Sequence, residues 1–208
     1  HYQEQSMEIE MLPVKEFKEW KRFLESQEGF SLVEMITVVA VMGIILAMAA
    51  PNFSKWKEKH EINGQAQKVY FDLMLARTNA IKNNNNVLVT FDTIGDTYKI
   101  HQDTNGNGTE DAGEALKSVN LENNIQFAVN SGTVDIDGNN VGSAVSFSGS
   151  QTVTFDARGQ TSASGSVFLL HIKDIGVTSN RARSISVLKA TGSVDYWSYD
   201  DSVSPPWK

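Results

Sequence analysis

The sequence lacks cysteine altogether. This absence excludes disulfide bonds, thiolate zinc sites and cysteine nucleophiles from the chain, and also the lipid-modified cysteine that anchors lipoproteins. Cysteine usage therefore gives no indication of the compartment in which the protein works. With 208 residues, of which 40% are hydrophobic, the chain is long enough for one domain with a sizeable core and an additional segment.

Positive charge is also in short supply. The chain has 18 Lys and Arg against 25 Asp and Glu, which gives a formal net charge of −7. Nucleic-acid binding depends on clustered basic residues that release counterions from phosphates, so this balance argues against nucleic acid as the main partner. A local DNA-binding patch stays open as an alternative, and its members would be Arg158, Arg181, Arg183 and Lys189.

Catalytic patterns are missing as well. The sequence has neither a nucleophile-elbow pattern nor a phosphate-binding loop, and its 4 histidines are scattered. One of them, His171, lies in an apolar run, where a histidine more often belongs to the core than to an active site. No set of residues resembles a nucleophile with its base and orienting group. We therefore predict that the protein is not an enzyme.

What the chain does have is one long apolar segment. No residue from Met35 to Ala50 carries a charge. A helix from Phe30 to Phe53 would be about 36 Å long and would cross a hydrocarbon layer of roughly 30 Å. Three interpretations compete: a buried core helix, a retained membrane helix, and a secretory signal peptide cleaved after the small-residue pattern Ala47-Met48-Ala49.

The residues that open this segment have a recognisable pattern. Gly29-Phe30-Ser31-Leu32-Val33-Glu34, followed by the apolar run and Pro51, resembles the prepilin signature of type IV pilins and type II secretion pseudopilins. This resemblance implies that a prepilin peptidase cleaves after Gly29 at the cytoplasmic face of the inner membrane. Phe30 would become the N-methylated first residue of the mature chain. Residues 1–29 would be a leader that is removed, although this leader is longer and more acidic than is usual in the family.

Glu34 is the one carboxylate at the start of the apolar segment. A carboxylate in hydrocarbon costs several kcal/mol unless a partner neutralises it. In the resembling family, the glutamate at this place is proposed to pair with the terminal amine of a neighbouring subunit during assembly. The resemblance thus implies an assembly role for Glu34, and the alternative is a glutamate that extends to the membrane interface.

After the apolar segment, the pattern indicates an amphipathic helix over residues 54–86, with a kink at Pro51 because proline removes an amide donor and clashes with the preceding turn. Its expected apolar stripe follows i, i+3, i+4 spacing: Ile62, Ala66, Val69, Tyr70, Leu73, Met74, Ala80 and Ile81. The stretch "FDLMLARTNAIKNNNNVLVTFD" is similar to the minor pilins that include the H-type pseudopilin and the FimT-like and FimU-like proteins.

Residues 87–208 are predicted to form a β-rich globular domain. Short β-branched or alternating runs separated by Gly, Asn and Ser predict nine strands, at 87–92, 97–101, 116–120, 125–129, 144–147, 152–156, 167–172, 183–189 and 194–199. Such spacing favours antiparallel sheets packed on the helix, so the predicted fold class is α+β and pilin-like. "TFDARGQTSASGSVFLLH" and "RARSISVLKATGSVDYWSYD" resemble the closing β-region of the same minor pilins.

Between two of these strands lies a twelve-residue stretch with the spacing of a calcium-binding loop. Gly108 would permit its sharp turn, and a strand rather than a helix precedes it. The predicted oxygen ligands are Asp103, Asn105, Asn107, the Thr109 carbonyl, Asp111 and Glu114. The alternative is a surface turn rich in Asn and Gly. The shorter stretch Asp135 to Asn139 is predicted to be a turn only.

Taken with the resemblance, these features predict a minor pilin or pseudopilin anchored by residues 30–53 as a single pass in the bacterial inner membrane, with its globular domain in the periplasm. Its implied partners are the prepilin peptidase, the membrane, and other pilin or pseudopilin subunits. Two other functions stay open: a pilus-tip module that binds DNA or surfaces, and a membrane-anchored periplasmic protein that binds calcium.

Overall fold

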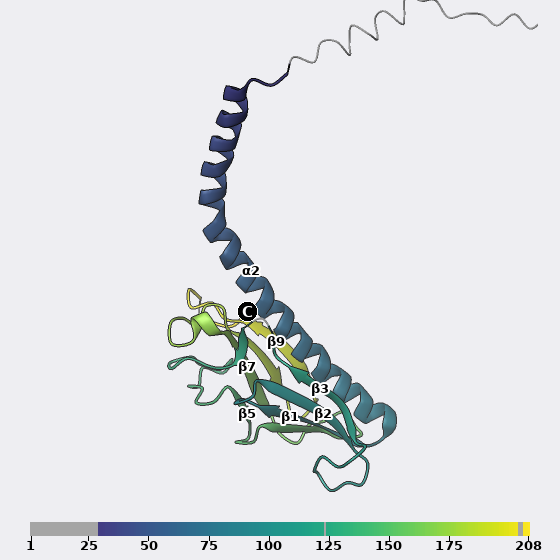
Figure 1. Ribbon diagram of the computed structural model, residues 1–208. Helices are drawn as coiled ribbons and strands as arrows, with labels where there is room; N and C mark the ends of the chain where they lie inside the picture. The colour runs from purple at the N-terminus through teal and green to yellow at the C-terminus, as the bar shows by residue number, and fades with distance from the viewer. Residues whose placement is uncertain (1–28, 123, 204–205) are drawn as a thin grey trace, which may run out of the picture. The chain divides into compact units, whose positions relative to one another are not determined.

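The computed structural model describes residues 29–122, 124–203 and 206–208, so the predicted leader lies outside it apart from Gly29. The chain divides into two compact units, residues 1–51 and 52–208. One helix, α2 (Leu32–Asn83), belongs to both, and a short 3₁₀ helix, η1 (Ile172–Asp174), follows later (Figure 1). The strands are β1 (Asn86–Asp92), β2 (Thr97–Asp103), β3 (Ala115–Asn120), β4 (Ile125–Phe127), β5 (Val145–Phe147), β6 (Thr152–Phe155), β7 (Gly165–His171), β8 (Arg183–Val187) and β9 (Val194–Ser198).

Helix α2 continues through Pro51. The side chains of residues 49–52 lie outside the described part of the structure, so the kink expected at Pro51 stays a prediction. Among the described residues, no single helix is long and apolar enough to cross a membrane. Two consecutive parts of α2, Leu32–Met48 and Phe53–Asn83, are long and apolar enough when taken together as a bent span. This statement rests on their length and composition only.

The end of α2 is set by local chemistry at an asparagine. Asn84 has a left-handed backbone with φ +52°, a conformation that asparagine tolerates better than most residues. The next amide, on Asn85, donates to the carbonyl of Ala80 at 3.2 Å, which is the hydrogen bond expected of a Schellman cap. The helix therefore stops at Asn83, three residues before the predicted boundary, and β1 begins at Asn86.

The strands form two antiparallel sheets. In the first sheet the order is β3-β2-β1-β6, and in the second β4-β7-β8-β9, with β5 also pairing with β7. The register of the first sheet places Val89 opposite Ile100 on one side and Val153 on the other. In the second sheet Val167 lies opposite Ile185. All nine predicted strands are present, with ends that differ by at most two residues.

The core forms where the second half of α2 packs against both sheets (Figure 1). The helix contributes residues at spacings of three and four, which puts them on one face: Ile62, Ala66, Val69, Leu73, Ala76 and Ala80. Two predicted stripe residues are exposed instead, Met74 by 39% and Ile81 by 49%. The prediction was wrong there because both lie at the edge of the stripe, where the sheets no longer cover the helix.

Strand β7 is buried on both faces. Val167 and Leu169 belong to the main core, whereas Phe168 and Leu170 belong to a second cluster that includes Trp207 near the C-terminus. This double burial explains why β7 is an apolar run and does not alternate. It also places His171, 2% exposed, at the buried end of the strand, as the sequence suggested for this residue.

Candidate functional site

The predicted processing site lies directly before α2. Gly29, Phe30 and Ser31 precede the helix, and the Ser31 carbonyl accepts a hydrogen bond from the amide of Met35 at 3.1 Å. The Phe30 side chain is 76% exposed. Glu34 is in the first turn, where the positive end of the helix dipole favours a carboxylate. The junction thus lies just before the helix, and Glu34 follows Phe30 by four residues, in the first turn of α2.

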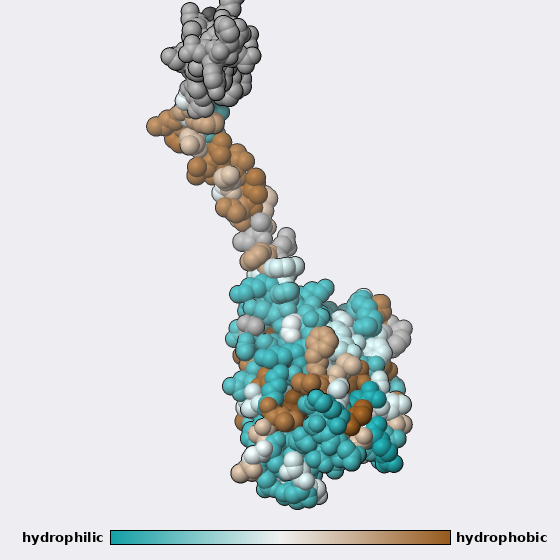
Figure 2. Space-filling view, turned by 90° about the vertical axis from the view of Figure 1, so that its right-hand side faces the viewer, coloured by the Kyte–Doolittle hydropathy of each residue, from teal (hydrophilic) through white to brown (hydrophobic). Residues whose placement is uncertain are grey.

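Nothing in the described part of the chain covers the apolar segment that follows. Ile36, Val39 and Leu46 are 59%, 67% and 68% exposed. Figure 2 shows this segment as a continuous brown region, in contrast to the mainly hydrophilic surface of the globular unit. Exposed apolar side chains in such number mark a surface that is buried by lipid or by another protein.

In the globular unit, a buried carboxylate ties α2 to the loop around η1. Glu58 accepts hydrogen bonds from Lys173 at 2.6 Å and from Arg181 at 2.5 Å. Arg181 also forms a two-point contact with the carboxylate of Asp174, which is 2% exposed. The hydrogen bonds from Lys173 and Arg181 lower the pKa of Glu58 to about 2. The hydrogen bonds to Asp174, more than those to Glu58, raise the pKa of Arg181. We call these four residues the Glu58 cluster.

Further along α2, Asp72 makes a second buried contact with a sheet. Its carboxylate accepts hydrogen bonds from the Tyr98 hydroxyl and from Lys117, both at 2.6 Å. Burial, with the Asp72 carboxylate as the smaller cause, raises the pKa of Tyr98. The contact fixes β2 and β3 against the helix, because Tyr98 and Lys117 lie on these neighbouring strands.

Arg77 holds two tight turns together. Its guanidinium donates to the carbonyl of Gly159 at 3.0 Å and to the carbonyl of Thr191 at 2.9 Å. The two turns touch so closely that a Cβ at Gly192 would lie 1.8 Å from the Gly159 oxygen. Since one turn follows β6 and the other joins β8 to β9, Arg77 links the first sheet, the second sheet and the helix.

The predicted calcium loop connects β2 to β3. Its carboxylates accept hydrogen bonds from its own backbone: Asp103 from the amides of Asn107 and Gly108, both at 3.0 Å, and Glu114 from the amide of Thr104 at 2.8 Å. Asp103 and Glu114 are 4% and 5% exposed. The hydrogen bond from the Thr104 hydroxyl, with smaller backbone contributions, lowers the pKa of Glu114.

The remaining predicted ligands are partly brought together. Asp111 accepts from the side-chain amides of Asn105 at 2.7 Å and Asn107 at 2.6 Å. Gly108 has φ +74°, which permits the sharp turn at the sixth position of the loop. Across the described ranges, no three carboxylate, histidine or cysteine side chains are grouped so that they could hold a metal ion. In this structure, hydrogen bonds within the loop hold it together, and the carboxylates of Asp103 and Glu114 accept mainly from backbone amides.

The four basic residues of the alternative DNA patch do not form a free basic surface. Arg181 is bound in the Glu58 cluster. Arg183 is 3% exposed and donates to Asn63 at 2.7 Å and to the carbonyl of Ala182 at 2.8 Å. Tertiary packing thus buries Arg183 and pairs the partly exposed Arg181 with carboxylates, so these two residues give the alternative of a DNA patch no support.

The weaker acidic stretch is a turn, as predicted. The Asp135 carboxylate accepts from the amides of Asp137 at 2.9 Å and Asn139 at 2.8 Å, and Gly138 has φ +84°. This is the local pattern by which an aspartate closes its own turn.

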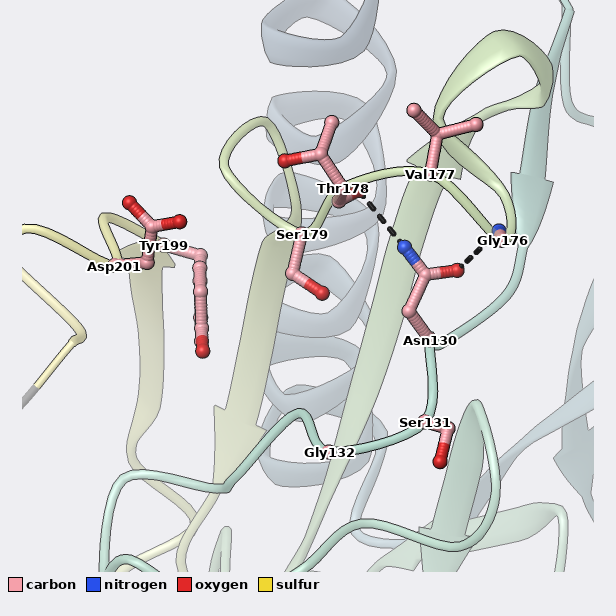
Figure 3. Close-up of a pocket in the computed structure, with 9 residues that line it drawn as sticks. All are labelled: Asn130, Ser131, Gly132, Gly176, Val177, Thr178, Ser179, Tyr199 and Asp201. Carbon is pink, nitrogen blue, oxygen red and sulfur yellow. Dashed lines mark hydrogen bonds between the residues drawn. The ribbon is translucent and has the colours of Figure 1, made fainter.

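An open pocket of about 390 Å³ lies between the loop before β5, the loop after η1 and the C-terminal segment (Figure 3). Asn130 spans one side, accepting from the amide of Gly176 at 2.7 Å and donating to the carbonyl of Thr178 at 2.8 Å. Tyr199 and Asp201 lie opposite. The lining is Asn130, Ser131, Gly132, Gly176, Val177, Thr178, Ser179, Tyr199 and Asp201. It offers polar contacts, and no histidine, cysteine or lysine lines it.

The sequence prediction missed Glu58, Asp72 and Arg77. A signal for the first two was present, because both fall on the buried face of the helical stripe at three or four residues from Ile62, Val69 or Ala76. A carboxylate in that position must be paired with a cation or protonated. For Arg77 there was no such signal, because its partners are backbone carbonyls in two distant turns.

Two family profiles match the chain. The profile described as "Type II transport protein GspH" matches residues 65–191, more than half of the chain. The profile described as "Prokaryotic N-terminal methylation motif" matches residues 25–50. The second match covers the predicted cleavage junction, Glu34 and the apolar segment, and the first covers most of the globular unit. No curated protein sequence matches the chain.

Among solved structures, the chain is similar to the minor pseudopilin EpsH from the type 2 secretion system of Vibrio cholerae, with 14% identity and a TM-score of 0.45 over 66% of this chain and 97% of that one. It is also similar to the type IV minor pilin FimU of Pseudomonas aeruginosa, with 14% identity and a TM-score of 0.45 over 67% and 90% of the two chains. Scores this low add nothing to the description of the helix and sheets given above.

Proposed function

The chain belongs to the family of the type II transport protein GspH, and on that premise we propose that it is made as a precursor, cleaved between Gly29 and Phe30, and N-methylated at Phe30. Proteins of this family are structural subunits of a type II secretion pseudopilus or a type IV pilus. We further propose a single membrane pass over residues 30–53 in the inner membrane, with the globular unit in the periplasm, and a structural rather than an enzymatic role.

One observation carries this proposal. The cleavage motif stands immediately before a helix whose apolar side chains are exposed from its first turns onward, as for Leu32 at 74% and Val33 at 68%. A soluble domain does not keep such a surface in water. A helix that lies in the membrane before assembly, and in a bundle of similar helices after assembly, has apolar surroundings in both places. Its exposed apolar side chains are then never in contact with water.

The mature N-terminus tests the proposal directly. In cells that contain the prepilin peptidase, we expect mass spectrometry of the membrane-extracted protein to find a chain that begins at methylated Phe30. Deletion of the peptidase should leave the leader in place. A chain that begins at Ala50 would instead establish cleavage after Ala47-Met48-Ala49 by a signal peptidase, and would contradict both the anchor and the assembly role.

Glu34 is the residue that we propose for recognition between subunits. In the membrane, its carboxylate would pair with the terminal ammonium group of a neighbouring mature subunit, which removes the cost of an isolated charge in hydrocarbon. Two observations support this role. The first part of α2 is exposed, and the Glu34 carboxylate has no cationic partner among the residues described around it. Other pilin or pseudopilin subunits are therefore the expected partners.

As a second property, we propose that the loop from Asp103 to Glu114 binds one calcium ion. The loop has the full spacing of ligands, the left-handed glycine at the sixth position, and three carboxylates among its predicted ligands, Asp103, Asp111 and Glu114. A cation would relieve the repulsion between these carboxylates, and the outward-facing loops of extracellular modules bind calcium with Kd on the order of 10⁻⁴–10⁻³ M. The hydrogen bonds that Asp103 accepts from the fifth and sixth residues support a loop already folded for this purpose.

A further inference from the structure

Three aromatic rings stack along the exposed face at the start of the globular unit. The ring centroids of Phe53 and Trp56 are 5.7 Å apart, and those of Trp56 and His60 are 5.6 Å apart with nearly parallel planes, at 9°. Phe53 is 64% exposed and Trp56 is 60% exposed. We call these three residues the aromatic ladder. They lie on the side of α2 opposite Ile62, so the core of the protein does not bury them.

Lysines flank the ladder on both sides. At 100° per residue around a helix, Lys57 lies on one side of the ladder and Lys59 on the other, whereas Lys55 lies at the same level but on the side of Ile62. All three are exposed, and only Lys57 has a carboxylate within 4.0 Å among the described residues, namely Glu61 at 3.6 Å. Glu58 is turned inward and paired with Lys173 and Arg181. This outward surface is therefore basic in an otherwise acidic protein.

The distance along the helix matches the thickness of a lipid headgroup layer. Trp56 follows Phe53, the last residue of the proposed membrane pass, by three residues, which is about 4.5 Å of helix. Headgroup regions extend about 5–8 Å beyond the hydrocarbon on each side of a bilayer. Tryptophan rings gather at that level because they combine apolar area with a polar N–H group, and lysines reach phosphates from there.

We propose that the aromatic ladder and Lys55, Lys57 and Lys59 bind the headgroup layer of the membrane, with the lysines contacting anionic phosphates. This inference rests on the proposed anchoring of residues 30–53. The contact would hold the globular unit at a fixed level above the bilayer before assembly. A neighbouring subunit is the other candidate occupant, but lipid is favoured because the ladder follows the apolar segment directly and three exposed lysines lie at the same level of the helix, of which only Lys57 has a carboxylate nearby among the described residues.

The absence of cysteine makes the test direct, because an introduced thiol is the only one in the chain. The full-length chain is reconstituted in phosphatidylcholine vesicles, with or without phosphatidylglycerol, and carries a small fluorophore on Trp56→Cys, Phe71→Cys or Val39→Cys. Phe71 is the matched control, since it is 61% exposed on the same helix but about 22 Å further along than Trp56. Quenching is measured with nitroxide lipids labelled at the headgroup or in the acyl chain.

We expect headgroup-labelled lipid to remove most of the fluorescence at position 56 and little of it at position 71. Replacement of Lys55, Lys57 and Lys59 by glutamine should abolish any increase in quenching at position 56 that phosphatidylglycerol causes. Equal quenching at positions 56 and 71 would overturn the proposal. So would a signal at position 56 that changes with the protein-to-lipid ratio, because it would assign the ladder to a second copy of the chain.

Position 39 separates this proposal from the one on which it rests. Quenching there by acyl-chain nitroxides, together with an unquenched position 56, would contradict the headgroup contact alone. An unquenched position 39 would show that the apolar segment is not in the bilayer, and would overturn the anchor and the headgroup contact together.

Discussion

At the scale of single residues, the charged groups on the buried face of α2 decide how the helix is attached to the sheets. Glu58 and Asp72 are 8% and 5% exposed, and each is neutralised by a cation from a different part of the chain. Removing one partner of such a contact leaves the other group buried without compensation, which costs more than the pair contributes. Loss of either carboxylate would therefore destabilise the packing of the helix against the sheets by more than the ion pair itself contributes.

We expect Glu58→Gln to destabilise the globular unit by about 1–3 kcal/mol at neutral pH, because Arg181 and Lys173 lose a charged acceptor. The folded-state pKa of Glu58 is about 2, below its ordinary value of 4.5. A depressed carboxyl pKa gives stability that is present above pH 4.5 and is lost as the pH falls toward 2. The difference between wild type and variant should thus shrink over that interval.

Chemical denaturation at a series of pH values measures this difference. Glu61→Gln is the matched control, since Glu61 lies one turn further along and has only a 3.6 Å contact with exposed Lys57 and a 4.0 Å approach to His171. It should change the free energy of unfolding by less than about 1 kcal/mol. A Glu58→Gln effect that is independent of pH would contradict the ion-pair explanation.

At the scale of elements, the turn glycines determine how closely the two sheets approach each other. Gly192 has φ +60°, and a Cβ there would overlap the backbone oxygen of Gly159. We expect Gly192→Ala to cost at least about 2 kcal/mol, which lowers the melting temperature of the globular unit by about 4–8 °C. Thermal unfolding followed by circular dichroism measures it.

Two other glycines separate the causes. Gly176 has φ +74° but open space around it, so Gly176→Ala reports the cost of the left-handed backbone alone. Gly64 is helical with nothing nearby, so Gly64→Ala should be neutral or stabilise by up to about 1 kcal/mol. A Gly192→Ala variant no less stable than Gly176→Ala would show that the turns separate at no cost.

The loop between β2 and β3 gives the second prediction at this scale. We expect calcium at a hundredfold excess over Kd to stabilise residues 52–208 by about 2.7 kcal/mol. This unit contains the whole described core, so it should fold without the apolar segment. Melting temperatures in calcium and in chelator are compared, with the double variant Asp103→Ala/Glu114→Ala as the control without ligands.

Magnesium serves as a second control for that measurement, because its octahedral preference fits a flexible twelve-residue loop poorly. If calcium and chelator give the same melting temperature and calorimetry detects no binding at millimolar metal, the loop is an ordinary turn closed by its own hydrogen bonds.

At the scale of the whole molecule, the two units differ in which side chains they expose. The first has exposed apolar side chains along its helix, and the second has a closed core.

We expect Glu34→Ala to leave membrane insertion and leader cleavage largely unchanged, and to reduce incorporation into the filament. The reason is that the proposed partner of Glu34 belongs to another subunit, so the isolated helix loses only a costly charge.

Crosslinking to a co-expressed major pilin, through a cysteine introduced in each chain, measures incorporation. Thr37→Ala is the control, because it removes a polar group one turn away whose hydroxyl bonds only to its own helix, at Val33 and Glu34. Crosslinking of Glu34→Ala at the wild-type level would remove the proposed role of the carboxylate.

The sequence by itself determined the features that depend on neighbouring residues: the apolar segment, most of the helical stripe, the nine strands and the turn from Asp135 to Asn139. Hydrophobic periodicity and turn chemistry act over a few residues, so they can be read locally. Only the tertiary structure decided which charges pair and which are exposed. Lys117 lies 45 residues from Asp72, and Arg181 lies 123 residues from Glu58. No local pattern encodes such partners, because the antiparallel arrangement of both sheets has to form before these side chains meet.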